Sequence, residues 1–76
     1  MSKQLEKQIQ EQRESLSANI LKLRSKNQLS QQALANLAGV DRKTVNRIEC
    51  GHFSPSLDTL VRLGEAFKIP TGKLLG

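Results

Sequence analysis

The sequence predicts an all-α domain, and three observations lead to this fold class. Apolar residues recur at spacings of three and four, which is the period of a helix with one buried face. Serine, aspartate and glycine residues stand at the ends of these periodic segments, where helices commonly begin and end. No alternating apolar–polar run suggests a strand. With 76 residues, the chain is long enough for one small core and too short for two.

The first predicted helix has its buried face at Leu16, Ile20 and Leu23, which are spaced by four and three residues. It should run to about Lys26, where a turn follows. Because the chain has two Phe residues and neither Trp nor Tyr, its core must be mainly aliphatic, which suits short packed helices.

The second and third predicted helices are bounded by capping residues and glycines. Ser30 is a good N-cap for the second helix, and Gly39 ends it where a left-handed conformation is expected. Asp41 caps the third helix and Gly51 ends it. Their apolar positions are Ala33, Leu34, Leu37, Ala38, Val45 and Ile48. Because the connection between them is so short, the two helices must meet at a steep angle, as in a helix-turn-helix.

Two further helical segments follow. Ser56 caps a fourth helix, and Pro70 can open a last short helix. The apolar positions of these segments are Leu57, Leu60, Leu63, Phe67, Leu74 and Leu75. The pattern therefore predicts five helices in all.

The net charge of +5 is unevenly distributed along the chain. Three bases and three acids cancel in residues 1–14, namely Lys3, Lys7 and Arg13 against Glu6, Glu11 and Glu14. The whole excess therefore lies in residues 15–76. Such an excess favours nucleic acid, acidic proteins or anionic lipid, and does not by itself choose among them.

The remaining composition excludes several classes of protein. No apolar run approaches the roughly 18–20 residues of a membrane span, and residues 1–14 do not resemble a signal peptide. The single cysteine, Cys50, excludes an internal disulfide framework. Cys50 and His52 have too few neighbours of the right kind for a metal site or an activated nucleophile. We therefore expect a cytoplasmic, non-enzymatic protein with no metal and no cofactor.

The exposed face of the third helix is the strongest functional signal. On a helical wheel with about 100° per residue, the basic and amide side chains of this helix fall within about 140° of one another, opposite Val45 and Ile48. They are Arg42, Lys43, Asn46 and Arg47, with no acid among them. Arginine suits guanine O6 and N7, asparagine suits adenine N6 and N7, and lysine can serve guanine or a phosphate. The alternative is an ordinary solvated helix face, although such faces usually include acids.

The stretch LSQQALANLAGVDRKTVNRIECGHFSPSLDTLVRLGEAFKIP, Leu29 to Pro70, preceded by ILKLR at residues 20–24, resembles the Cro and lambda-repressor type of helix-turn-helix, or XRE family. The resemblance covers roughly Leu16 to Leu75. It implies a five-helix, lambda-repressor-like DNA-binding domain, which agrees with the segments above.

The resemblance also implies roles for individual residues. Arg42, Lys43, Asn46 and Arg47 match the base-reading or groove-lining positions. Gln31 matches a glutamine that binds a DNA phosphate and braces the recognition helix. From their places in the sequence, Ser30, Thr44 and His52 are assigned to phosphate contact or positioning. Thr44 alternatively contacts a thymine methyl, and His52 alternatively faces solvent. Arg24 and Glu49 match a pair that ties the first helix to the end of the third, a role in architecture rather than in readout.

Three positions depart from the family pattern or stay open. Cys50 stands where relatives usually carry a polar or basic residue, and Leu37 where they are usually polar. Leu37 is either a single exposed leucine or packed against the N-terminal segment. Phe53 lies either near a dimer axis or in the core.

Residues 1–14 form an extension that precedes the usual start of the family, and residues 15–76 form the DNA-binding domain. Leu5 and Ile9 fall within about 20° of Leu16 on a helical wheel, so one helix from about Lys3 to Lys26 would carry a narrow apolar stripe for a partner helix or a second subunit. Alternatively, Ser15 or Ser17 caps a fresh helix and residues 1–14 are separate. We favour a helical extension.

The function expected is that of a sequence-specific regulator of transcription, which lies on the nucleoid when it is bound to DNA. A homodimer would place its recognition helices in successive major grooves of a near-palindromic operator, about 34 Å or 10 bp apart, and would repress by occluding a promoter. A phage repressor, a restriction–modification controller and an antitoxin all fit. The alternative is an antitoxin-like or other protein-interaction module that uses residues 1–14, with DNA binding secondary. RNA binding ranks third, since no aromatic stacking platform is present.

Overall fold

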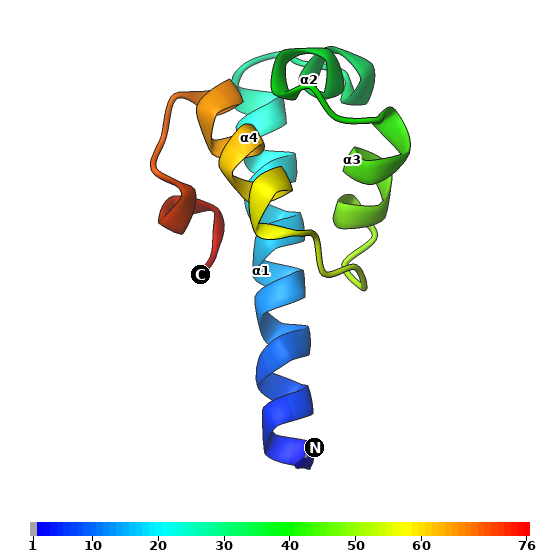
Figure 1. The fold of residues 1–76 in the computed structure, drawn as a ribbon, viewed down its shortest axis with the longest axis vertical. Coiled ribbons are helices and arrows are strands. Elements are labelled where there is room, and N and C mark those ends of the chain that lie inside the picture. The colour runs from blue at the N-terminus through cyan, green and yellow to red at the C-terminus, as the bar shows by residue number, and fades with distance from the viewer. Residues whose placement is uncertain (1) are drawn as a thin grey trace.

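The protein consists of helices packed around one small core, as a computed structural model of the chain shows for residues 2–76 (Figure 1). The elements are α1 (Lys3–Lys26), α2 (Gln31–Ala38), α3 (Arg42–Glu49), α4 (Leu57–Phe67) and the 3-10 helix η1 (Thr71–Leu74). No strand occurs within residues 2–76. The all-α fold class is therefore confirmed.

The prediction of five α-helices is wrong in its last member, because η1 is a 3-10 helix of four residues. Lys73 N–H donates to the Pro70 carbonyl at 3.0 Å, across three residues rather than four. A segment this short that contains Gly72 gains little from α-helical hydrogen bonds, and 3-10 geometry is common in such short connectors. Leu74 is nonetheless fully buried, so this turn still closes the core.

The first helix is continuous over 24 residues, which resolves the two alternatives for the N-terminal segment. The Ser2 hydroxyl accepts from Leu5 N–H and caps the helix. Ser17, a candidate start for a fresh helix, is buried inside α1 and donates its hydroxyl to the Glu49 carbonyl at 2.7 Å. The N-terminal half of α1 projects beyond the other helices (Figure 1). Although α1 is long, no helix among residues 2–76 is apolar enough to cross a membrane.

Every helical element contributes to the core. Its largest fully buried side chains come from α1, α2, α3, α4 and η1 and are Ile20, Leu34, Val45, Ile48, Leu63 and Leu74. Phe67 joins them, and Phe53 packs against them half-buried. Phe53 is therefore part of the core margin. Leu37, by contrast, is 62% exposed, so it is a single exposed leucine rather than a contact of the N-terminal segment.

The predicted helix caps explain where the elements begin and end. The Ser30 hydroxyl accepts from Ala33 N–H at 3.0 Å, and the Ser56 hydroxyl accepts from Thr59 N–H at 3.1 Å. Both bonds satisfy amides that a helix start leaves without a partner. Asp41 occupies the N-cap position of α3 with extended backbone, but its side chain makes no capping hydrogen bond.

Candidate nucleic-acid interface

The turn between α2 and α3 sets the angle between the two helices. Gly39 adopts φ +70°, in the left-handed region where side chains other than that of glycine are strained. Val40 N–H then donates to the Ala35 carbonyl at 3.0 Å, which closes the end of α2. Ala35 and Ala38 are buried at this junction, so the small side chains let α2 and α3 approach closely.

The third helix has one buried face and one exposed face, as its pattern predicts. Val45 and Ile48 are at most 1% exposed. The side chains on the opposite face, Arg42, Lys43, Asn46 and Arg47, are all exposed, and Thr44 is half-buried between the two faces. Four hydrogen-bonding side chains, three of them cationic, therefore cover the outer face of α3.

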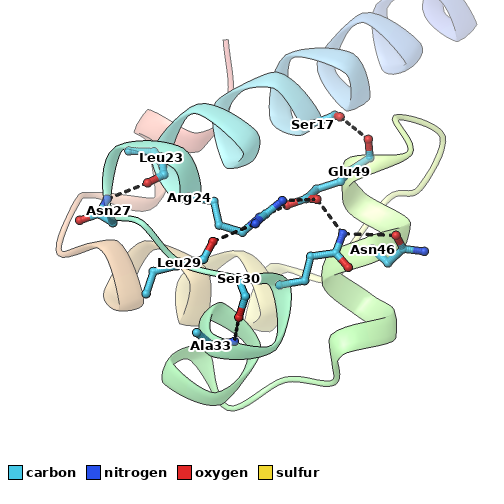
Figure 2. A network of polar contacts seen from close by, with 10 residues as sticks. Ser17, Leu23, Arg24, Asn27, Leu29, Ser30, Ala33, Asn46 and Glu49 are labelled. Carbon is cyan, nitrogen blue, oxygen red and sulfur yellow. Dashed lines mark hydrogen bonds and ion pairs between the residues drawn. The ribbon is translucent and has the colours of Figure 1, made fainter.

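Glu49, the one acid within α3, is turned away from this face. Its side chain is 7% exposed, and Arg24 of α1 donates to its carboxylate through Nε at 2.7 Å and through Nη2 at 3.2 Å (Figure 2). Arg24 Nη1 also donates to the Leu29 carbonyl at 2.8 Å, which fixes the turn before α2. The Arg24–Glu49 pair predicted from the resemblance thus connects the first helix, the turn before α2 and the end of the third helix.

Gln31, the first residue of α2, lies between Glu49 and the exposed face of α3. Its Nε2 donates to Glu49 Oε1 at 2.8 Å and to Asn46 Oδ1 at 3.3 Å. The Gln31 amide therefore orients the Asn46 side chain through its oxygen, and the NH₂ group of Asn46 takes no part in this bond. Since an amide oxygen has two lone pairs, Asn46 keeps both the acceptor and the donor that adenine requires.

The other candidate residues lie at the two ends of the helix-turn-helix. Ser30 is exposed at the start of α2, where its hydroxyl proton is not used by the cap and can still be donated. His52 is exposed in the turn that follows α3, two residues after Cys50, which is also exposed. No group of three or more metal-binding side chains is present within residues 2–76.

Two sets of neighbours were missed by sequence reasoning. A polar groove of about 470 Å³ runs along the outer side of the α2–α3 turn and is lined by Gln32, Asn36, Val40, Asp41, Arg42 and Lys43. At the other end, Gln10 and Arg13 of α1 bond to residues of the turn after α3. The helical spacing of Gln32 and Asn36 could have indicated the first set. Nothing local in the sequence indicates the second.

The chain was compared with protein-family models and with known proteins. The helix-turn-helix model HTH_3 matches residues 20–74, which is more than half of the chain. A search of curated protein sequences gave no match. Solved structures, in contrast, gave several similar chains.

A hypothetical transcription factor from Neisseria superimposes with a TM-score of 0.80 at 26% identity, over 86% of this chain and 75% of that one. The restriction–modification controller protein C.AhdI from Aeromonas hydrophila gives a TM-score of 0.77 at 32% identity, over 82% of this chain and 94% of its own. An HTH_3-family transcriptional regulator from Vibrio cholerae gives 0.77 at 25% identity, and this chain spans 35% of its length.

These matches agree with the fold and with the geometry of α2 and α3. The HTH_3 family model covers both helices, and the similar structures include named regulators of transcription. The chain belongs to the XRE-type helix-turn-helix family of DNA-binding transcriptional regulators.

Proposed function

We propose that this chain is a sequence-specific repressor that binds double-stranded DNA as a homodimer, with α3 in the major groove. The observation that carries the proposal is the charge on α3. Its exposed face holds Arg42, Lys43, Asn46 and Arg47, while the acid of the same helix is 7% exposed and paired with Arg24. This face carries basic side chains and an amide, and the one acidic side chain of the helix lies away from it. Such a face suits the negative potential of DNA and the edges of its base pairs.

The proposal assigns base contacts to the outer face of α3 and phosphate contacts to its surroundings. Arg42, Lys43, Asn46 and Arg47 read base edges in the major groove. Gln31, Ser30, Thr44 and His52 contact the phosphate backbone and fix the position of α3. In this arrangement the protein acts in the cytoplasm on a near-palindromic operator, and a dimer lying across a promoter prevents transcription from starting there.

Selection of binding sites from random duplex DNA tests the DNA-binding part of the proposal. The expected result is an inverted repeat whose half-sites are about 10 bp apart, since two symmetric recognition helices enter successive major grooves. Affinity for the selected site should also fall steeply with salt as phosphate contacts are lost. Binding that depends on salt but prefers no sequence would contradict the proposal.

The second subunit has a suitable docking surface on the N-terminal half of α1. An apolar groove of about 290 Å³ lies between α1, the turn after α3 and the chain's C-terminal end, lined among others by Ile9, Leu16, Phe53, Leu60 and Leu75. Apolar side chains are also exposed on α1 and α4, with Leu5 at 45%, Leu57 at 70% and Val61 at 50%, and Leu75 of the groove is itself 42% exposed. Apolar surface gathered in this way favours association.

The charge of the docking surface favours a second copy of this chain as its occupant. In the N-terminal half of α1, the positive charges of Lys3, Lys7 and Arg13 balance the negative charges of Glu6, Glu11 and Glu14. This half is therefore neutral in a chain of net charge +5. Two copies can therefore meet through their N-terminal halves without the repulsion that their basic DNA-binding faces would cause. The interface would also leave α3 of each subunit free for DNA.

Two exposed leucines of α1 provide a matched test of the dimer. Leu5 lies on the apolar stripe and is 45% exposed, whereas Leu21 is 42% exposed and lies about 160° further around the same helix. Light scattering should show a wild-type dimer that Leu5→Glu shifts towards monomer and Leu21→Glu leaves intact. A monomeric wild type at micromolar concentrations would contradict the homodimer.

The same measurement distinguishes the alternative, a protein-interaction module that uses residues 1–14. In that case the wild type would be monomeric, and Leu5→Glu would leave sequence-specific DNA binding unchanged. The homodimer instead predicts that Leu5→Glu weakens binding to the inverted repeat while a single half-site is still recognised.

A further inference from the structure

The turn after α3 is held in place by two side chains from the N-terminal half of α1. Gln10 Nε2 donates to the Gly51 carbonyl at 2.7 Å and lies 3.2 Å from His52 Nδ1. Arg13 Nε donates to the Ser54 hydroxyl at 2.7 Å, and Arg13 Nη1 donates to Gln10 Oε1 at 3.3 Å. The four bonds form one network that connects α1 to residues about 40 positions later in the chain.

The network fixes both the Gln10 amide and the His52 ring. A carbonyl oxygen only accepts and a guanidinium only donates, so the Gly51 carbonyl requires the NH₂ group of Gln10 and Arg13 requires its oxygen. The second hydrogen of the Gln10 NH₂ group is then directed at His52 Nδ1, which must act as the acceptor. A neutral imidazole whose Nδ1 accepts carries its proton on Nε2.

We propose that Gln10 and Arg13 are positioning residues for DNA binding, which hold the turn after α3 so that His52 presents its Nε2–H to a DNA phosphate. The inference rests on the proposed function of the chain as a DNA-binding regulator. It gives residues 3–14 a part in DNA recognition that needs no net charge of their own. The segment acts through His52 rather than by direct contact with DNA.

The backbone of this turn makes such a restraint useful. Gly51 adopts φ +85°, in the left-handed region that side chains other than that of glycine rarely adopt, so the path of this turn depends on one glycine. His52 and Ser54 are exposed. Holding the turn before DNA arrives removes part of the entropy that binding would otherwise lose by ordering it. Because the turn directly follows α3, a displaced turn would also move His52 relative to the groove that α3 enters.

The first test needs no DNA, because His52 is the one histidine of the chain. Nitrogen-15 NMR of the imidazole, above the pH at which the ring is protonated, should show the Nε2–H tautomer with Nδ1 shifted as a hydrogen-bond acceptor. Gln10→Ala should move the Nδ1 signal, and Gln4→Ala, a change of the same type at an exposed position of α1, should not. Identical imidazole shifts in the wild type and in Gln10→Ala would overturn the positioning role.

The second test is a double-mutant cycle on the selected DNA site, with thermal unfolding of every variant as the control for folding. Gln10→Ala and His52→Ala should each weaken binding roughly three- to tenfold, the scale of one hydrogen bond. The double variant should lose no more than His52→Ala alone, since Gln10 acts through that ring. Ser54→Ala removes the partner of Arg13 without changing the charge, and it should weaken binding in the same direction. Additive losses in the double variant would overturn the inference.

The two tests separate this inference from the proposed function. A wild-type chain that binds no specific sequence overturns the proposed function and the phosphate contact of His52 together. A wild-type chain that binds its site normally, with a His52 signal that does not respond to Gln10→Ala, overturns the positioning role alone.

Discussion

Arg24 Nε lies 2.7 Å from Glu49 Oε2 and joins the first helix to the end of the third. The two residues are 25 positions apart, and the Glu49 carboxylate also accepts from Gln31. The backbone carbonyl of Glu49 accepts from Ser17. The C-terminal end of α3 is therefore tied to α1 and α2 at several atoms, which fixes the direction in which its exposed face points.

Arg24→Ala should destabilise the fold, because it leaves the Glu49 carboxylate almost buried with the Gln31 amide as its remaining partner. Removing one member of a buried pair costs about 3–5 kcal/mol, and we expect about 2–4 kcal/mol here since Arg24 is 21% exposed. Urea unfolding followed by circular dichroism measures the change.

The control for this prediction is the exposed pair between Lys68 and Glu65, whose side chains are 81% and 79% exposed. Lys68→Ala should leave the free energy of unfolding unchanged within error, since exposed pairs contribute little. The double change Arg24→Ala/Glu49→Ala should recover part of the stability lost in Arg24→Ala. If the double variant were less stable than the single one, the unpaired carboxylate would not be the cause.

Gly39→Ala should destabilise the fold by about 1 kcal/mol, because φ +70° is strained for alanine. The new Cβ would also lie 3.2 Å from Arg62 Nη1, a flexible end that can move away. Gly72→Ala is the matched control, since its Cβ would meet nothing within 4 Å. Thermal unfolding of both variants checks the prediction, and equal midpoints would show that the Gly39 conformation is not required.

Gln31→Ala should weaken binding to specific and nonspecific DNA more evenly than changes on α3 do. We assign Gln31 to a phosphate, which carries no sequence information directly. The same change removes the bond to Asn46, so a smaller loss of preference at one base pair is expected as well. Titrations of the selected site and of a scrambled duplex give the two losses. A loss confined to the selected site would instead make Gln31 a base reader.

Much of the fold could be predicted because the signals are local. Ser30, Gly39 and Ser56 act on amides or torsions within a few residues of themselves, so their effect is readable from short stretches. The buried positions Ile20, Val45 and Ile48 follow from helical spacing in the same way. The exposed residues of α3 were predictable too, because they are the ones that lie opposite the buried positions on the helical wheel.

The contacts of Gln10 and Arg13 were missed because they join residues that are far apart in the sequence. Gln10 and Arg13 meet the turn after α3 only because α1 continues without a break past Ser15 and Ser17, and either serine could have begun a new helix. A side chain that bonds 41 positions away leaves no period in the sequence. The 3-10 form of η1 was missed for a different reason: a segment of four residues is short enough for either helix type, and sequence spacing does not separate the two.

The measurement that tests the account most directly is site selection repeated with Arg42→Ala and Arg47→Ala, followed by titration of the wild-type site. Each variant should lose about 1–3 kcal/mol of affinity and relax its preference at one base pair in each half-site. That result would establish that the outer face of α3 reads bases in the major groove. If the variants instead bind every sequence more weakly by the same factor and select an unchanged motif, the account is contradicted. The basic side chains of this face would then act only by attracting phosphates.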